Sequence, residues 1–218
     1  MPGLLTVVVI IAVFIFIIVI AWHYEKKRNE AMQAAAAALE FSFSPDADDA
    51  FLPSLPQFHL FSQGYSKKAS NVMHGAAGGI DVTMFDYRYT TGTGKSSSRH
   101  VQTVILFRSD LLRLPRFTLR SEHIFHKIGK AFGGQDINFE SHPEFSGKYL
   151  LRSPDEQACR DMFTDIVLGY FDQHHELSVE GENGSLLFYR NPKKVPPADI
   201  QSFLENGLEV FSLFKADI

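Results

Sequence analysis

The N-terminal region contains an uninterrupted apolar run of 19 residues, from Leu4 to Trp22, without a charged side chain. As a helix, which rises 1.5 Å per residue, this run is about 28 Å long, close to the ~30 Å hydrocarbon core of a bilayer. A helix also hydrogen-bonds its own backbone, as a lipid environment requires. The sequence therefore predicts a transmembrane anchor over residues 1–24.

Aromatic and basic residues at the end of the run indicate how the anchor is oriented. Trp22 and Tyr24 fall where an aromatic belt meets the membrane–water interface, and Lys26, Lys27 and Arg28 follow. We predict that these five residues lie at the membrane interface, with the lipid bilayer as a partner. Because basic residues favour the cytoplasmic side, we expect a single-pass protein of the inner cell membrane with its C-terminal part in the cytoplasm.

A cleaved signal peptide and a buried core helix are the alternatives for the same run. A signal peptide has a positive region before a shorter apolar stretch, followed by small residues at a cleavage site. Here the basic cluster follows the apolar run instead of preceding it. This order favours an uncleaved anchor.

Residues 25–57 connect the anchor with the rest of the chain. The first part, EKKRNEAMQAAAAAL, consists mostly of strong helix formers and predicts a stalk that continues the transmembrane helix. The second part contains Pro45, Pro53 and Pro56 beside an acidic cluster, which is typical of a linker. We therefore expect the folded domain to begin near residue 58.

Hydrophobic periodicity predicts an α+β domain over residues 58–218, with an antiparallel sheet and about three packed helices. The chain has 20 Phe residues, so we expect an aromatic-rich core. Alternating side chains and turn residues predict strands at 70–75, 79–89, 100–107, 136–140, 146–151, 176–180 and 185–190. The spacing of the first three strands indicates an antiparallel meander.

Capping signals and helical spacing predict the three helices. One begins at Ser121 and ends at Gly133-Gly134, one begins at Ser153-Pro154, and one begins near Pro197. The second helix has an apolar stripe that we expect to be buried: Cys159, Met162, Phe163, Ile166, Val167 and Tyr170. Cys159 is the single cysteine of the chain, so no intrachain disulfide forms, and its place on this stripe favours an inert thiol over a nucleophile.

The segment Gly92-Thr93-Gly94-Lys95-Ser96 resembles the end of a phosphate-binding P-loop. The complete pattern needs a glycine at position 89, where Tyr89 stands. A P-loop also opens a helix, whereas the residues that follow predict a strand. We therefore interpret the segment as a loop between strands.

The nine histidines and several carboxylates suggest metal or acid–base sites without defining one. His123 and His126 share a helix face, and His174-His175-Glu176 lies at the end of a helix, but no third ligand is positioned by sequence. His142-Pro143-Glu144 together with Asp81 and Asp86 forms an acid–base set only if folding brings these residues within hydrogen-bond reach. We assign no catalytic, cofactor-binding or metal-binding residue and expect no cofactor.

Charge is unevenly distributed along the chain. Residues 88–130 carry nine basic and two acidic side chains, whereas residues 29–87 and 131–218 are net acidic. The basic groups balance the acidic segments, face solvent, or rest on the anionic cytoplasmic leaflet, where each contributes about 1 kcal/mol. Because the domain is net acidic and shows no nucleic-acid-binding pattern, we expect no nucleic acid partner.

A family likeness rests on four runs: FDYRYTTGTGKSSSRHVQTVILF, LPRFTL, HPEFSGKYLLRSPDEQACRDMF and LLFYR. They resemble a group of uncharacterised bacterial membrane proteins that share an N-terminal hydrophobic helix and a single domain of this pattern. The likeness extends over roughly residues 58–214. It implies a bacterial, single-pass membrane protein and brings no known activity, substrate or cofactor.

Three functions are open at this point. We expect a non-enzymatic interaction or scaffolding module that recruits a protein partner, because tethering to a membrane raises the effective concentration of a weak binder. A membrane-associated enzyme or small-ligand binder is the second reading, and a deep pocket with convergent polar groups, such as His142, Glu144 and Asp86 in one cleft, would favour it. A sensor of anionic lipid is the third, and it requires the basic groups of residues 88–130 on one face.

Overall fold

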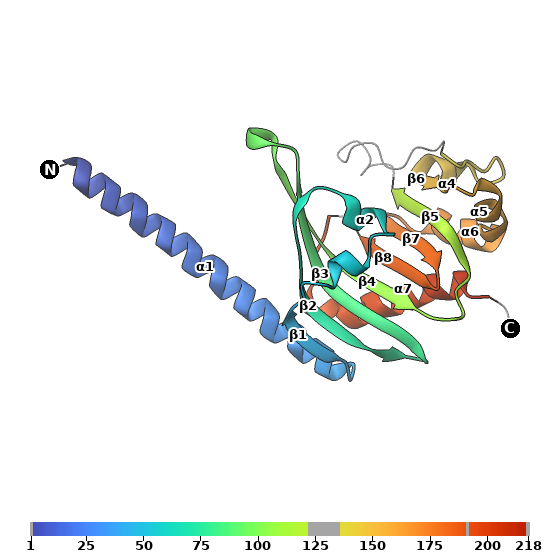
Figure 1. Ribbon diagram of the computed structural model, residues 1–218, viewed down its shortest axis with the longest axis horizontal. Helices are drawn as coiled ribbons and strands as arrows, with labels where there is room; N and C mark the ends of the chain where they lie inside the picture. Colours follow the sequence, from blue (N-terminus) through green and yellow to red (C-terminus); the bar gives the residue numbers. More distant parts are fainter. Residues whose placement is uncertain (1, 122–135, 191, 217–218) are drawn as a thin grey trace.

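Helix α1 (Pro2–Ala38) is the longest element of the computed structural model. Its 37 residues span about 55 Å. The N-terminal half extends away from the sheet and the other helices (Figure 1), and its apolar side chains are exposed, for example Phe14 at 66%. The part Thr6–Ala38 is long and apolar enough to cross a membrane, and none of its apolar window is buried. The apolar run and the segment after it therefore form one continuous helix, and the alternative of a buried core helix is wrong.

Helix α1 ends where the chain turns back into the sheet. Glu40 adopts a left-handed conformation with φ of 59°. The Glu40 amide donates to the Ala37 carbonyl oxygen at 3.1 Å, and the Phe41 amide donates to the Ala36 carbonyl oxygen at 2.9 Å. These two bonds form the Schellman motif, which satisfies the last carbonyl groups of a helix. Ala36 and Phe41 are both buried, so the motif is packed into the core.

Replacing Glu40 with glycine is expected to stabilise the protein by about 0.5–1 kcal/mol, because glycine adopts the left-handed conformation without the steric cost of a Cβ atom. Urea unfolding of the full-length protein in detergent measures the change. Glu30→Gly is the matched control, since Glu30 is exposed in the interior of the same helix. There glycine should lower the stability by a similar amount, and a shift in the same direction for both variants would contradict this account of the helix end.

Eight antiparallel strands form one sheet in the order β1-β2-β3-β4-β8-β7-β5-β6, within the residues that the structure describes, 2–121, 136–190 and 192–216. The strands are β1 (Ser42–Asp46), β2 (Tyr65–Ala77), β3 (Ile80–Thr91), β4 (Ser98–Arg108), β5 (Leu114–Ser121), β6 (Tyr149–Arg152), β7 (Leu177–Asn183) and β8 (Ser185–Arg190). The remaining helices are η1 (Leu52–Ser54), α2 (His59–Ser62), η2 (Gly94–Ser96), α4 (Pro143–Lys148), α5 (Glu156–Met162), α6 (Asp165–Gln173), η3 (Pro197–Asp199) and α7 (Ile200–Phe214). The α+β class and the initial meander are confirmed.

Both faces of the sheet are covered (Figure 1). On one face, a large core that includes Met84 and Phe107 packs against α7, α5, α6 and the end of α1. On the other face, a smaller core around Phe85 and Tyr87 packs beneath the segment that contains η1 and α2. Neighbours such as Met84 and Phe85 contribute to different cores because successive side chains of a strand point to opposite faces.

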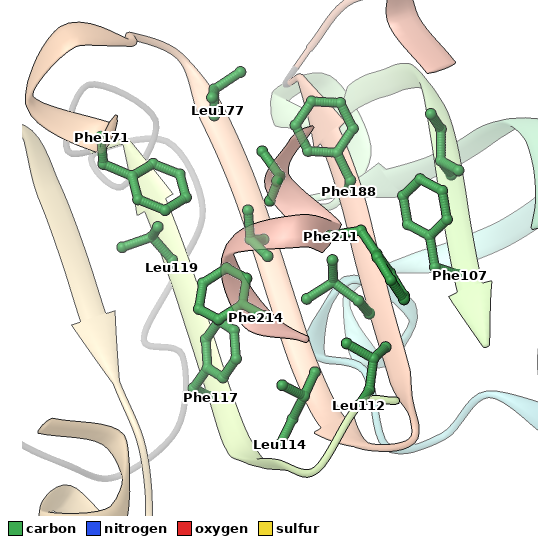
Figure 2. Packing of buried hydrophobic residues seen from close by; sticks show 14 of the residues in the cluster. Phe107, Leu112, Leu114, Phe117, Leu119, Phe171, Leu177, Phe188, Phe211 and Phe214 are labelled. Carbon is green, nitrogen blue, oxygen red and sulfur yellow. The ribbon is translucent and has the colours of Figure 1, made fainter. Parts of the chain in front are cut away.

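Helix α7 contributes two aromatic anchors to the larger core. Figure 2 shows Phe211 and Phe214 directed at the sheet, and their ring centroids lie 5.6 Å from that of Phe107 and 5.4 Å from that of Phe117, respectively. The helix approaches the strands closely at Gly207, where a Cβ atom would lie 2.9 Å from the Phe107 ring. The expected aromatic-rich core and the third expected helix are thus present.

The sequence does not predict strands β1 and β5. Strand β1 lies in the segment expected to be a linker, and its pairing with β2 means that the sheet begins before residue 58. Strand β5 contains a proline and two arginines, and it is defined by its pairing with β6 and β7. Residues 136–140, which were expected to form a strand, are irregular.

The second expected helix is divided into α5 and α6. The helix breaks at Phe163, and Thr164 begins a new helix as the N-terminal cap of α6. The break changes the helical phase, so Ile166 is 77% exposed instead of buried, while Cys159 and Phe163 are buried as expected. The first expected helix, between Ser121 and Gly134, lies outside the described residues.

Candidate functional site

The carboxylate of Asp86 on β3 is buried, with 1% of the residue exposed, and donors converge on it from several elements. Arg28 Nε donates to Oδ2 at 2.7 Å and Arg28 Nη2 donates to Oδ1 at 2.8 Å. Asn71 Nδ2 donates to Oδ2 at 3.1 Å, and Thr103 Oγ1 donates to Oδ1 at 2.9 Å. Lys194 Nζ lies 3.2 Å from Oδ2. A buried charge persists only with such partners.

Arg28 connects helix α1 with the sheet. Its side chain is 18% exposed, and its Nη2 atom also donates to the Val195 carbonyl oxygen at 3.0 Å. Arg28 follows Trp22 by six residues, so fewer than two helical turns separate the apolar run from the ion pair. Met32 and Ala36 are buried one and two turns further along the same helix face. Helix α1 is therefore docked on the domain over its last three turns.

The pKa of Asp86 shows that its partners outweigh its burial. Burial alone raises the pKa of this carboxyl, whereas the hydrogen bonds and charge of Arg28, the charge of Lys194 and the hydrogen bond from Thr103 lower it. The net result is a pKa below the ordinary value. The carboxylate is therefore ionised at neutral pH, and the ion pair with α1 persists.

A small cavity of about 200 Å³ lies beside this ion pair. Its lining includes Glu25 and Asn29 of α1, Lys68 of β2, Arg88 of β3 and Arg99 of β4. The cavity thus lies between the helix, just after the apolar run, and the first strands of the meander. We call it the α1 cavity.

A second group of buried polar side chains lies on the opposite face of the sheet. Glu180 accepts hydrogen bonds from Arg120 Nη2 at 3.2 Å, Tyr189 Oη at 2.8 Å and the Leu60 amide at 3.1 Å. Burial and the nearby Arg120 lower the pKa of His59 to about 3, so this imidazole is neutral. Since the Leu60 amide belongs to α2, the group holds α2 on the sheet.

Two wider grooves lie on the surface. One of about 790 Å³ is lined by the acidic Asp48 and Asp49 and by the basic Lys67, beside η1. The other, of about 1140 Å³, lies between β5, α5, α6 and the end of α7 and includes the exposed Ile166. Both have more apolar walls than the α1 cavity, and the first shares Asp46, Lys68 and Arg88 with it.

The predicted membrane-interface residues separate into two groups. Trp22 and Tyr24 are 63% and 69% exposed. Lys26 Nζ lies 5.6 Å from the centroid of the Trp22 ring, and Lys27 is exposed. Arg28 instead points to the domain and binds Asp86, because its helix face is the one that packs on the sheet.

The residues considered for acid–base chemistry do not converge. His142 Nδ1 lies 2.8 Å from Asp172, which raises the pKa of the imidazole, and Glu144 lies 2.8 Å from Lys148. Asp86 is on β3, the third strand from one edge, whereas His142 and Glu144 lie beside β6 at the other edge. These three residues therefore do not form one acid–base set.

The histidines considered as metal ligands are also dispersed. His123 and His126 lie outside the described residues, and His174 Nδ1 lies 2.7 Å from the Tyr170 carbonyl oxygen. In the part of the chain that the structure describes, no three His, Cys, Asp or Glu side chains form a group that could hold a metal ion. Burial raises the pKa of the Cys159 thiol to about 12, which makes it a poor nucleophile.

The loop that resembles a P-loop joins two antiparallel strands. Its residues Gly94–Ser96 form the single turn η2 between β3 and β4. No helix follows it, since the next element is β4. The interpretation as a loop between strands is confirmed.

The basic residues of the middle segment do not share one face. Arg108 and Arg116 lie 3.7 Å and 3.6 Å from carboxylates of neighbouring strands, and Arg120 is in the buried group around α2. Arg88 and Arg99 instead line the α1 cavity. Part of the band thus balances acidic residues within the fold, and part of it faces the end of the apolar helix.

Arg28 and Asp86 are both prominent in the sequence, but the sequence does not pair them. They are 58 residues apart and belong to a helix and a strand. The available signal is the spacing of Arg28, Met32 and Ala36, which places them on one face of the stalk and predicts that this face packs against something. The partner in the sheet is defined only by the fold.

These features define a class: an α+β domain with one antiparallel sheet, docked on a long apolar helix through a buried ion pair. Among solved structures, the chain is similar to the crystal structure of the mycobacterial trehalose monomycolate transport factor A, TtfA, with a TM-score of 0.59 and 15% sequence identity. The match covers 85% of this chain and 91% of that one. No protein-family model and no curated protein sequence matches the chain. At this level of identity, the likeness shows a shared fold.

Proposed function

We propose that the chain is a single-pass membrane protein whose domain serves as an accessory module of a membrane transport system and acts by binding a protein partner. The observation that carries the proposal is the exposed apolar half of α1, continuous with a half that is fixed to the sheet by Arg28 and Asp86. A helix built this way holds the domain in a defined position at the membrane surface. A flexible tether would not.

The orientation follows from the charges beside the apolar run. Lys26, Lys27 and Arg28 lie on the C-terminal side of the run, which favours that side as cytoplasmic. The resemblance to bacterial single-pass membrane proteins supports the inner membrane of a bacterium. The domain then faces the cytoplasm.

The transport role is suggested by the structural neighbour. TtfA is a trehalose monomycolate transport factor, and its match covers 85% of this chain and 91% of that one. We infer a similar kind of role for this chain. The low sequence identity allows the cargo and the partner to differ from those of TtfA. A groove beside an exposed apolar residue, Ile166, offers a surface for such a partner.

Site-specific photo-crosslinking in intact cells tests this proposal. A photoreactive residue at Ile166, in the groove between α5, α6 and α7, should give a crosslink to an integral membrane protein of a transport system, identified by mass spectrometry. The matched control is Ser202, which is exposed on the outer side of α7. The same label there should give no such product.

The outcomes separate the functions. A crosslink to a membrane transport protein from Ile166 and none from Ser202 supports the accessory role. Crosslinks only to soluble proteins, or equal products from both positions, would count against it.

A further inference from the structure

We propose that the α1 cavity binds a phosphate group, presented either by the headgroup of an anionic lipid or by a free organic phosphate. The proposal rests on the membrane-anchor part of the proposed function, since the anchor places the cavity near lipid headgroups. It does not depend on the transport role or on a protein partner.

Three of the basic side chains that line the cavity are already paired with carboxylates. Arg28 and Lys194 both contact Asp86, at 2.7 Å and 3.2 Å. Lys68 Nζ lies 2.8 Å from Asp46. These pairs account for two of the three acidic residues in the lining, and the third is Glu25, exposed on α1.

The two other basic side chains of the lining are those of Arg88 and Arg99. The lining holds five basic and three acidic residues, an excess of two positive charges. Neither Arg88 nor Arg99 forms an ion pair with a carboxylate in the described part of the chain. Two guanidinium groups that face one small cavity without acidic partners repel each other, and a bound anion relieves this repulsion.

The strand register places these groups on one face of the sheet. Lys68 pairs with Arg88, and Thr90 pairs with Arg99. Arg88 and Thr90 are two residues apart on β3, so their side chains point to the same side, and paired residues share a side. This is also the side of Asp86, on which α1 is docked. The basic groups are therefore directed toward the helix that comes from the membrane.

The position of the cavity along α1 corresponds to the headgroup layer. Glu25 and Arg28 line the cavity and follow Trp22 by three and six residues, or about 5 and 9 Å along the helix axis. The headgroup layer on each side of the hydrocarbon core is about 5–8 Å thick. A lipid headgroup beside α1 is thus at the depth of Arg88 and Arg99.

The chemistry of the lining favours phosphate. A guanidinium group binds two phosphate oxygens at once and stays charged at every physiological pH. The cavity of about 200 Å³ has the volume of about six or seven water molecules, which accommodates a phosphoryl headgroup but not an acyl chain. The acyl chains of such a lipid would lie against the exposed apolar half of α1.

Native mass spectrometry of the full-length protein in detergent tests the proposal. The protein is titrated with phosphatidylglycerol, with phosphatidylcholine and with glycerol 3-phosphate, and bound adducts are counted. Arg88→Gln and Arg99→Gln are compared with Arg113→Gln, which removes an exposed arginine outside the α1 cavity. Arg99 is exposed, so its replacement leaves the core intact even if Arg88→Gln affects folding.

We expect the unaltered protein and Arg113→Gln to bind phosphatidylglycerol equally, and Arg99→Gln and Arg88→Gln to bind at least tenfold more weakly. Phosphatidylglycerol binding that glycerol 3-phosphate does not displace identifies a lipid as the source of the phosphate. If glycerol 3-phosphate binds with an affinity similar to that of phosphatidylglycerol, the ligand is a free organic phosphate. Equal binding of either compound by Arg99→Gln and Arg113→Gln would overturn the proposal, as would no binding by the unaltered protein. Neither result would bear on the proposed role as a transport accessory that binds a protein partner.

Discussion

Arg28→Ala is expected to lower the free energy of unfolding by about 3 kcal/mol, because it leaves the Asp86 carboxylate buried without its main partner. Lys194 remains 3.2 Å away and offsets part of the loss, which places the value at the lower end for a broken buried pair. Helix α1 should also lose its fixed position on the sheet. Urea unfolding in detergent measures the first effect, and distances between spin labels on α1 and β4 measure the second.

Lys26→Ala is the control for this prediction. Lys26 also lies in an ion pair on α1, with Glu30 at 3.9 Å, but both side chains are exposed. Such surface pairs contribute about 0.5 kcal/mol or less. If Arg28→Ala and Lys26→Ala unfold at the same urea concentration, the buried pair does not hold the helix.

Acid should remove the difference between the unaltered protein and Arg28→Ala. The pKa of Asp86 is lower in the folded protein than in the unfolded chain, where it is about 3.9. The stability from this group is therefore present above about pH 4 and is lost as the pH falls through the folded-state pKa.

Replacing Ile11 and Ile15 together with arginine is expected to abolish membrane insertion of α1. Both side chains are exposed in the middle of the apolar run, and each arginine costs about 2.5–3.5 kcal/mol at the centre of a membrane helix. The full-length variant should then appear in the soluble or aggregated fraction of cells. The control is the replacement of both residues with leucine, which keeps the apolar run, and unchanged insertion of the arginine variant would show that the run does not enter the bilayer.

The strongest sequence signals correspond to elements that are defined by local pattern. The long α1 helix, the β3–β4 hairpin and α7 follow from apolar runs, alternation and capping residues. Strands β1 and β5 lack such a pattern, and only their neighbours in the sheet define them. The break before α6 likewise depends on packing, and it exposes Ile166 against the helical pattern.

The candidate site is less predictable than the fold, for a physical reason. Arg28 and Asp86 interact because the sheet brings a buried carboxylate beneath the stalk, and no local rule relates residues 58 positions apart. The same holds for Arg88 and Arg99, whose common face depends on strand register. Charge along the chain indicates that the middle segment is basic but not which of its residues are already paired.

Alkaline carbonate extraction of membranes from cells that produce the full-length chain tests most directly whether α1 holds the domain at a bilayer. The protein should stay in the membrane pellet with integral membrane proteins. If the protein is recovered in the carbonate supernatant instead, either intact or shortened by the apolar run, then α1 does not hold the domain at a bilayer.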